Sequence, residues 1–99
     1  MEMSEEQVNK LINKLNDEDY DVRKNVEDIL IKLGEQSIEP LINALNHDNP
    51  EIQMESARIL GKMGDKKAVN ALTDALKDGN PEFRREVSLA ISKIIDKNP

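Results

Sequence analysis

Few side chains in this sequence have the types and spacing that catalysis or ligand binding requires. The segment from Gly61 to Lys67 (GKMGDKK) combines glycines with lysines, as phosphate-binding loops do. It lacks the Gly-x-x-x-x-Gly-Lys-Ser/Thr spacing and follows no strand pattern, so we interpret it as structural. Gly61 then permits close helix packing, Gly64 ends a helix and Asp65 caps the next one. We therefore expect no bound cofactor.

The single histidine offers no better site. His47 is followed by Asp48 and aligns, in the repeat described below, with Asp17 and Asp78. We interpret His47 as a substitute for a loop aspartate, because no nucleophile lies at a spacing that would pair with it. The chain has no cysteine, which excludes disulfides, thiolate metal sites and cysteine nucleophiles. We expect no catalytic residue, no metal site and no enzymatic activity.

Composition excludes further classes of partner. The net charge of −6 repels phosphate backbones, and Tyr20 and Phe83 are the only rings that could stack on bases. No apolar run reaches the length that spans a bilayer. The first residues lack the basic and apolar segments of a secretory signal. We expect a soluble cytoplasmic protein that contacts neither nucleic acid nor membrane.

Apolar residues recur at a fixed interval and divide the chain into units. Each unit shows one triplet of apolar residues, and the triplets are separated by 30 and then 31 residues. The triplets are Val8, Leu11 and Leu15, then Ile38, Leu41 and Leu45, then Val69, Leu72 and Leu76. A fourth apolar position, occupied by Val22, Ile52 and Phe83, keeps the same steps. A register shared by two parts of the unit indicates a helical repeat.

Cap residues and spacing place two helices in each unit. Asn49 and Asn80 each precede a proline, which is typical of an N-cap, and Asp19 takes the same place in the first unit. Gly34 and Gly64 follow the last periodic apolar residues, where a left-handed conformation favours glycine. We predict six helices, near residues 5–15, 20–33, 38–46, 50–63, 67–77 and 81–96, in a single domain over 1–99. We name the odd members inner helices and the even members outer helices.

The second unit has a recognisable pattern. It reads Pro50-Glu51-Ile52-Gln53, then Ala57 to Gly61, then Gly64-Asp65 and Ala68-Val69-x-x-Leu72. This pattern resembles the HEAT-like repeat named after phycocyanobilin lyases, whose usual form has Pro-Glu-Val-Arg, Ala-Leu-Gly, a Gly-Asp turn and Ala-Val-x-x-Leu. Pro81 to Arg84 and Asp21 to Arg23 continue the resemblance over nearly the whole chain. It implies an all-α fold, a right-handed α-α superhelix (HEAT/armadillo-like solenoid) of six antiparallel helices and about two and a half to three repeats.

The resemblance implies an architecture more than an activity, because the repeat occurs in lyases, hydroxylases and adaptors. Deoxyhypusine hydroxylase holds irons with repeated His-Glu pairs, which are absent here. Repeat-type DNA glycosylases use a basic face with aromatic residues, which is also absent. Bilin lyases are generally larger and act with partner subunits, which leaves an accessory subunit or fragment as one alternative. We predict a non-enzymatic scaffold for a protein partner, and a self-assembling structural module is the other alternative.

Arg23 and Arg84, with Gln53 between them, occupy the arginine position at the start of each outer helix. We expect them to pair with the turn carboxylates Asp17 and Asp78, each pair contributing modestly to stability.

The candidate binding face lies on the inner helices, opposite the apolar stripe. It consists of Asn9, Asn13, Asn16, Glu39, Asn43, Asn46, Asn70, Asp74 and Lys77. Six of the ten asparagines belong to it, although asparagine is a poor interior helix former. Inner helices line the concave surface of solenoids, and amides both donate and accept hydrogen bonds. We hypothesise a groove for a protein segment, and an asparagine-rich solvated face without function is the competing interpretation.

The last helix is more apolar than a simple cap requires. Leu89 stands where the other outer helices have Asp28 and Arg58, and Ile95 stands where they have glycine. Weak self-association, excision from a longer array, and folding back over the adjacent hairpin are three interpretations.

Charge is distributed unevenly along the chain. Residues 1–34 hold nine acids and five bases (−4), residues 35–64 hold five and two (−3), and residues 65–99 hold six and seven (+1). This polarity favours head-to-tail contacts or a basic partner near the N-terminal half, and solvated helix faces without function are the competing interpretation.

Overall fold

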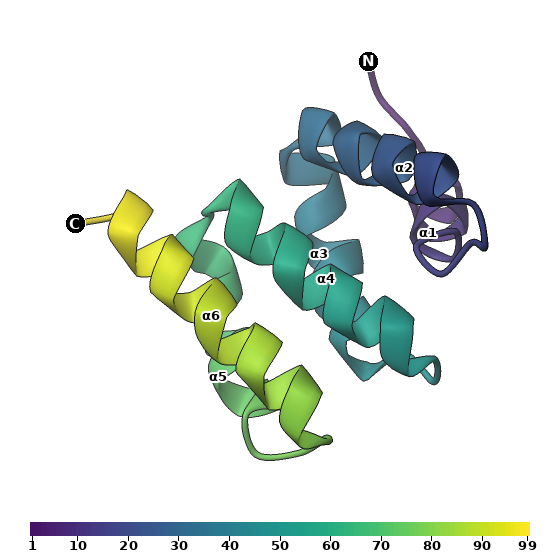
Figure 1. The fold of residues 1–99 in the computed structure, drawn as a ribbon. Coiled ribbons are helices and arrows are strands. Elements are labelled where there is room, and N and C mark those ends of the chain that lie inside the picture. Colours follow the sequence, from purple (N-terminus) through teal and green to yellow (C-terminus); the bar gives the residue numbers. More distant parts are fainter.

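The chain folds, in a computed structural model that describes residues 1–99, as a stack of helices without strands (Figure 1). The helices are α1 (Glu5–Ile12), α2 (Tyr20–Leu33), α3 (Glu35–Asn43), α4 (Pro50–Met63), α5 (Val69–Ala75) and α6 (Pro81–Lys97), with the 3-10 helices η1 (Ala44–Asn46) and η2 (Lys66–Ala68). The predicted all-α fold of six helices is confirmed. None of these helices combines the length and the apolar character needed to cross a bilayer.

Side-chain caps begin the helices at the predicted places. The Ser4 hydroxyl accepts a hydrogen bond from the Gln7 backbone N–H, and the Gln7 side chain accepts one from the Ser4 N–H, which completes a capping box. Asp19, Asn49 and Asn80 accept hydrogen bonds from backbone N–H groups in the first turns of α2, α4 and α6. These caps fix the starts of the outer helices, so α2 and α4 have the predicted bounds and α6 ends one residue later.

The inner helices deviate from the predicted bounds. Helix α3 begins at Glu35, three residues early, because Gly34 both ends α2 and precedes α3 without a loop. Its φ of 57° and ψ of −121° lie outside the left-handed helical region that we predicted and are accessible mainly to glycine. Gly64 does adopt the left-handed conformation, with φ 71° and ψ 18°. Helices α1 and α5 end earlier than predicted, because their last turns tighten into i to i+3 hydrogen bonds such as Leu15 N–H to the Ile12 carbonyl. Helix α5 also begins two residues later than predicted, because Lys66–Ala68 form the 3-10 helix η2.

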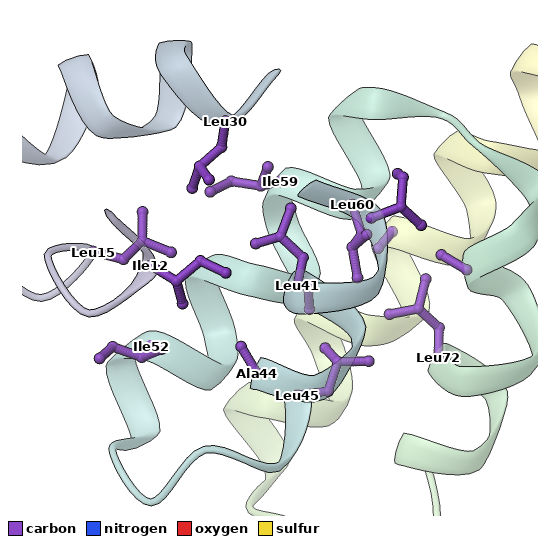
Figure 2. Close-up of a cluster of buried hydrophobic side chains, with 14 of the residues drawn as sticks. Ile12, Leu15, Leu30, Leu41, Ala44, Leu45, Ile52, Ile59, Leu60 and Leu72 are labelled. Carbon is purple, nitrogen blue, oxygen red and sulfur yellow. The ribbon is translucent and has the colours of Figure 1, made fainter. Parts of the chain in front are cut away.

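One apolar core of 19 buried residues runs through the stack. Leu30 of α2, Leu41 of α3 and Ile59 of α4 point into a shared interior (Figure 2). Most of the recurring triplet residues are buried there, as predicted, and three of them only pack against its edge: Leu11, Val69 and Leu76. Stacking therefore buries a stripe that no single hairpin could cover.

Small residues control how closely the outer helices approach. Helices α4 and α6 run side by side, whereas α2 is inclined to them (Figure 1). A Cβ atom at Gly61 would lie 2.8 Å from the Ala90 Cα, so the α4–α6 contact requires glycine there, as predicted. The equivalent residues at the α2–α4 contact are Ile31 and Ile59. Two branched side chains hold these helices farther apart than glycine and alanine do.

The apolar residues of α6 do not fold back over the adjacent hairpin. Leu89 is 50% exposed and Ile95 is 59% exposed, so that interpretation is wrong.

Candidate binding face

All nine predicted binding residues are exposed. They follow the inner helices and their last turns: Asn9, Asn13 and Asn16 at α1, Glu39, Asn43 and Asn46 at α3 and η1, and Asn70, Asp74 and Lys77 at α5. The inner helices therefore present these side chains to solvent.

Two hollows lie along this face. The first, of about 280 Å³, lies between α1 and α3, and Asn9, Asn13 and Asn43 line it. The second, of about 300 Å³, lies between α3, η1 and α5, and Asn43, Asn46 and Asp74 line it above an apolar floor. Asn43 belongs to both hollows, so they adjoin. Four predicted residues line neither of them: Asn16, Glu39, Asn70 and Lys77.

His47 replaces a loop aspartate, as predicted. Its Nδ1 accepts a hydrogen bond from the Asn49 backbone N–H at 2.9 Å, and the Asp17 carboxylate accepts one from the Asp19 N–H at the same distance. Because Nδ1 accepts, the ring proton is assigned to Nε2, which donates to the Asn13 Oδ1 at 3.0 Å. Asn13 therefore ties α1 to the turn before α4, which is a structural role in addition to any binding.

The poor helix propensity of asparagine does not support a binding role for most of these residues, because most of them lie outside helix interiors. Asn13 is the C-cap of α1, Asn43 is the last residue of α3, and Asn16 and Asn46 lie in the tightened turns that follow. Asparagine is well suited to such positions. Asn9 and Asn70 alone sit within helices, so the argument from helix propensity fails for four of the six.

Arg23 and Arg84 do not pair with turn carboxylates, so that prediction is wrong. The Arg23 Nη1 donates to the backbone carbonyl of Asp17 at 2.5 Å, and the Arg84 Nη1 donates to that of Gly79 at 2.9 Å. Gln53, at the equivalent position, donates to the Leu45 carbonyl at 3.0 Å. The tightened turns leave carbonyl groups that need a donor, and the Asp17 carboxylate already accepts the Asp19 N–H. An amide satisfies the same need, which explains why glutamine can replace arginine.

A buried ionic cluster lies between the outer helices α2 and α4 and was not predicted from the sequence. The Glu27 side chain in α2 is only 3% exposed, and it accepts hydrogen bonds from Arg58 and Lys62 of α4, each at 2.6 Å. Glu55 also binds Arg58. Glu27 lies beside the apolar Val26 at a position where the other units have Ala57 and Ser88. The sequence did contain one indication of this cluster, because a carboxylate occupies a repeat position where the other units have small residues.

The cluster sets the ionisation of its members. Burial of Glu27 opposes ionisation, but the hydrogen bonds from Lys62 and Arg58 outweigh it, so the pKa of the carboxyl lies below its usual value. Burial likewise opposes the charge on Arg58, but the hydrogen bonds to Glu27 and Glu55 raise its pKa. Glu27 and Arg58 are therefore both charged at neutral pH.

No group of three or more histidine, aspartate and glutamate side chains gathers where it could hold a metal ion. No curated protein matches the chain. The family model for HEAT repeats matches residues 8–92. The match begins in α1, ends in α6 and includes all three apolar triplets. The chain therefore belongs to the HEAT repeat family.

Proposed function

We propose that this chain is a non-enzymatic scaffold whose inner-helix face binds an extended segment of a partner protein. HEAT repeats are commonly protein-interaction scaffolds, which supports the general role. The observation that carries the specific proposal is the pair of adjoining hollows that share Asn43. We place this role in the cytoplasm, because small secreted domains commonly use disulfides and this chain has no cysteine.

The chemistry of the hollows favours an extended segment. Amide side chains at Asn9, Asn43 and Asn46 can donate to the carbonyl groups of a partner backbone and accept from its N–H groups. The second hollow also offers Ile42 and Ala75 to an apolar side chain. Asp74 pairs with Lys77 at 3.6 Å in an exposed bridge, which a binding segment can displace at little cost.

Selection from a random peptide library tests the proposal. Bound peptides should shift the NMR signals of the Asn43 and Asn46 side-chain amides. Asn43→Arg should abolish this binding, because a long, charged side chain at the boundary of the two hollows would fill space that the peptide needs. The Asn43 side chain makes no hydrogen bond within the fold, so the change should leave the fold intact. Asn25→Arg, an equal change of charge at an exposed residue of α2, should leave binding intact. Binding that survives Asn43→Arg, or signal changes confined to other surfaces, would contradict the proposal.

A second candidate rests on the residues from Asn49 to Leu72, whose pattern resembles the repeats of phycocyanobilin lyases. On that basis the chain would be an accessory subunit, or a fragment, related to bilin lyases. Copurification of a visible chromophore or a chromoprotein would favour this candidate, and a colourless preparation that still binds peptides through Asn43 would favour the scaffold.

A further inference from the structure

The side of α6 that faces away from α4 is exposed and partly apolar. Ala90 contacts α4, and Ser92 lies about 200° around the helix from it. Leu89 and Ile95 lie about 60° to either side of Ser92, so these three residues share one face. Leu89 is 50% exposed and Ile95 is 59% exposed, and nothing in the fold covers them.

This face repeats the surface through which α4 receives α6. In α4 that surface contains Ala57 and Gly61, and Gly61 allows the close approach to Ala90. The equivalent residues in α6 are Ser88 and Ser92. Small side chains at both positions allow another helix to approach α6 closely, while Leu89 and Ile95 supply apolar surface on the two flanks.

The N-terminal end of the stack is unsuited to that contact. On α3 and η1, the residues equivalent to the outward side of α1 and its last turn are buried: Ser37, Pro40 and Ala44. At these positions α1 and the turn that follows it carry Gln7, Lys10 and Lys14, all exposed. Stacking α6 of one copy on α1 of another would bury two lysines, of which only Lys10 has an acidic partner, Glu6 at 3.5 Å. The screened attraction between oppositely charged ends cannot offset that desolvation.

We propose that two copies of the chain associate through α6 about a two-fold axis near Ser92, with Leu89 of each copy against Ile95 of the other. Leu89 and Ile95 lie three residues before and after Ser92, so antiparallel pairing of two α6 helices places them opposite each other twice. The face is thus complementary to itself, as an isologous interface requires. This inference goes beyond the proposed function and leaves the inner-helix face free.

The distribution of charge along the chain also favours a second copy of the chain as the partner. In this pairing Arg85 of one copy lies about 4.5 Å along the axis from Asp96 of the second copy, which the guanidinium can reach. Helix α6 holds four basic and three acidic residues, whereas residues 1–34 carry a net charge of −4. Contact through α6 therefore joins the least acidic parts of two acidic chains and keeps their N-terminal ends apart.

Sedimentation equilibrium over a concentration series from about 20 µM to about 2 mM tests the proposal, since a single helix pair gives a weak dimer. The mass should rise from 11.2 kDa and saturate at twice that value. Leu89→Arg, which installs the residue that α4 has at Arg58, should weaken association roughly 30-fold, because each dimer loses two half-buried leucines. Tyr20→Arg, at an exposed ring on α2, should have no effect.

A cross-link tests the axis independently, because the natural chain has no cysteine. Ser92→Cys should form a covalent dimer on mild oxidation, while Ser4→Cys at the opposite end should not. A mass that stays monomeric up to the highest concentration would overturn the proposal. So would growth beyond the dimer, which indicates head-to-tail stacking, or a Leu89→Arg variant that is helical and associates like the natural chain.

Discussion

Replacing Glu27 with glutamine removes the one carboxylate that joins α2 to α4 and keeps the shape of the side chain. Breaking a buried ion pair from one side typically costs about 3–5 kcal/mol. Here the cations can partly recover solvent, because the Arg58 and Lys62 side chains are 30% and 36% exposed, and Arg58 keeps Glu55. We therefore expect Glu27→Gln to lower the free energy of unfolding by about 2–3 kcal/mol.

The cations should behave non-additively. Either Arg58→Met or Lys62→Met alone leaves Glu27 with one close partner, and we expect each to cost about 1 kcal/mol. The double variant leaves the buried carboxylate with Lys24 alone, whose Nζ lies 3.8 Å away. Its cost should therefore exceed the sum of the single costs by about 1–2 kcal/mol.

The effect should depend on pH in a fixed direction. Because the folded-state pKa of Glu27 lies below its unfolded value of 4.5, the carboxylate stabilises the fold fully above pH 4.5. That contribution is lost as the pH falls through the folded-state pKa. The difference in stability between the natural chain and Glu27→Gln should therefore be constant near neutral pH and shrink in acid.

Urea unfolding followed by far-UV circular dichroism measures these quantities at each pH. A Glu27→Gln cost below about 0.5 kcal/mol, the range of ordinary surface substitutions, would refute the reasoning. So would strictly additive effects of Arg58→Met and Lys62→Met, because then the two cations do not share one buried partner.

Three further predictions concern packing and turns. The buried Ser56 hydroxyl has no hydrogen-bond partner, so Ser56→Ala should raise the free energy of unfolding by about 1 kcal/mol in the same urea assay. Gly61→Ala should lower the thermal midpoint and cost about 1–3 kcal/mol, because the added Cβ would lie 2.8 Å from the Ala90 Cα, and an unchanged midpoint would contradict that contact. Arg23→Met should cost about 1 kcal/mol through its lost turn hydrogen bonds, whereas Arg85→Met, which makes none, should be neutral; equal costs would refute the assigned role.

The bounds of the outer helices could be predicted closely, because the residues at the helix ends determine them through local hydrogen bonds and backbone conformation. Asn49 followed by proline fixes the start of α4, and Gly64 fixes its end. The inner helices were harder, because a tightened last turn differs from an α-helix by one hydrogen-bond step that side-chain spacing does not report. The direct reversal at Gly34 depends on how α3 packs, so its unusual ψ could not be read from the glycine alone.

The candidate face could be assigned to one side of the stack from periodicity, but its hollows could not. Both arise from the spacing between neighbouring inner helices, which depends on packing over the whole stack. The partners of Arg23 and Asn13 could not be predicted by matching opposite charges either. Arg23 donates to a backbone carbonyl and Asn13 accepts from a histidine ring, and neither partner is an acidic side chain.

The pair of isoleucines between α2 and α4 has a consequence for how the molecule opens. Glycine against alanine lets α4 and α6 pack closely, whereas branched side chains separate α2 from α4 and the ionic cluster joins them. The stack is therefore packed more closely in its C-terminal part than in its N-terminal part. We expect the amide hydrogens of α1 and α2 to exchange with solvent before those of α4 and α6, as a separate cooperative unit. A ligand that spans both hollows would bridge this boundary and slow amide exchange in α1.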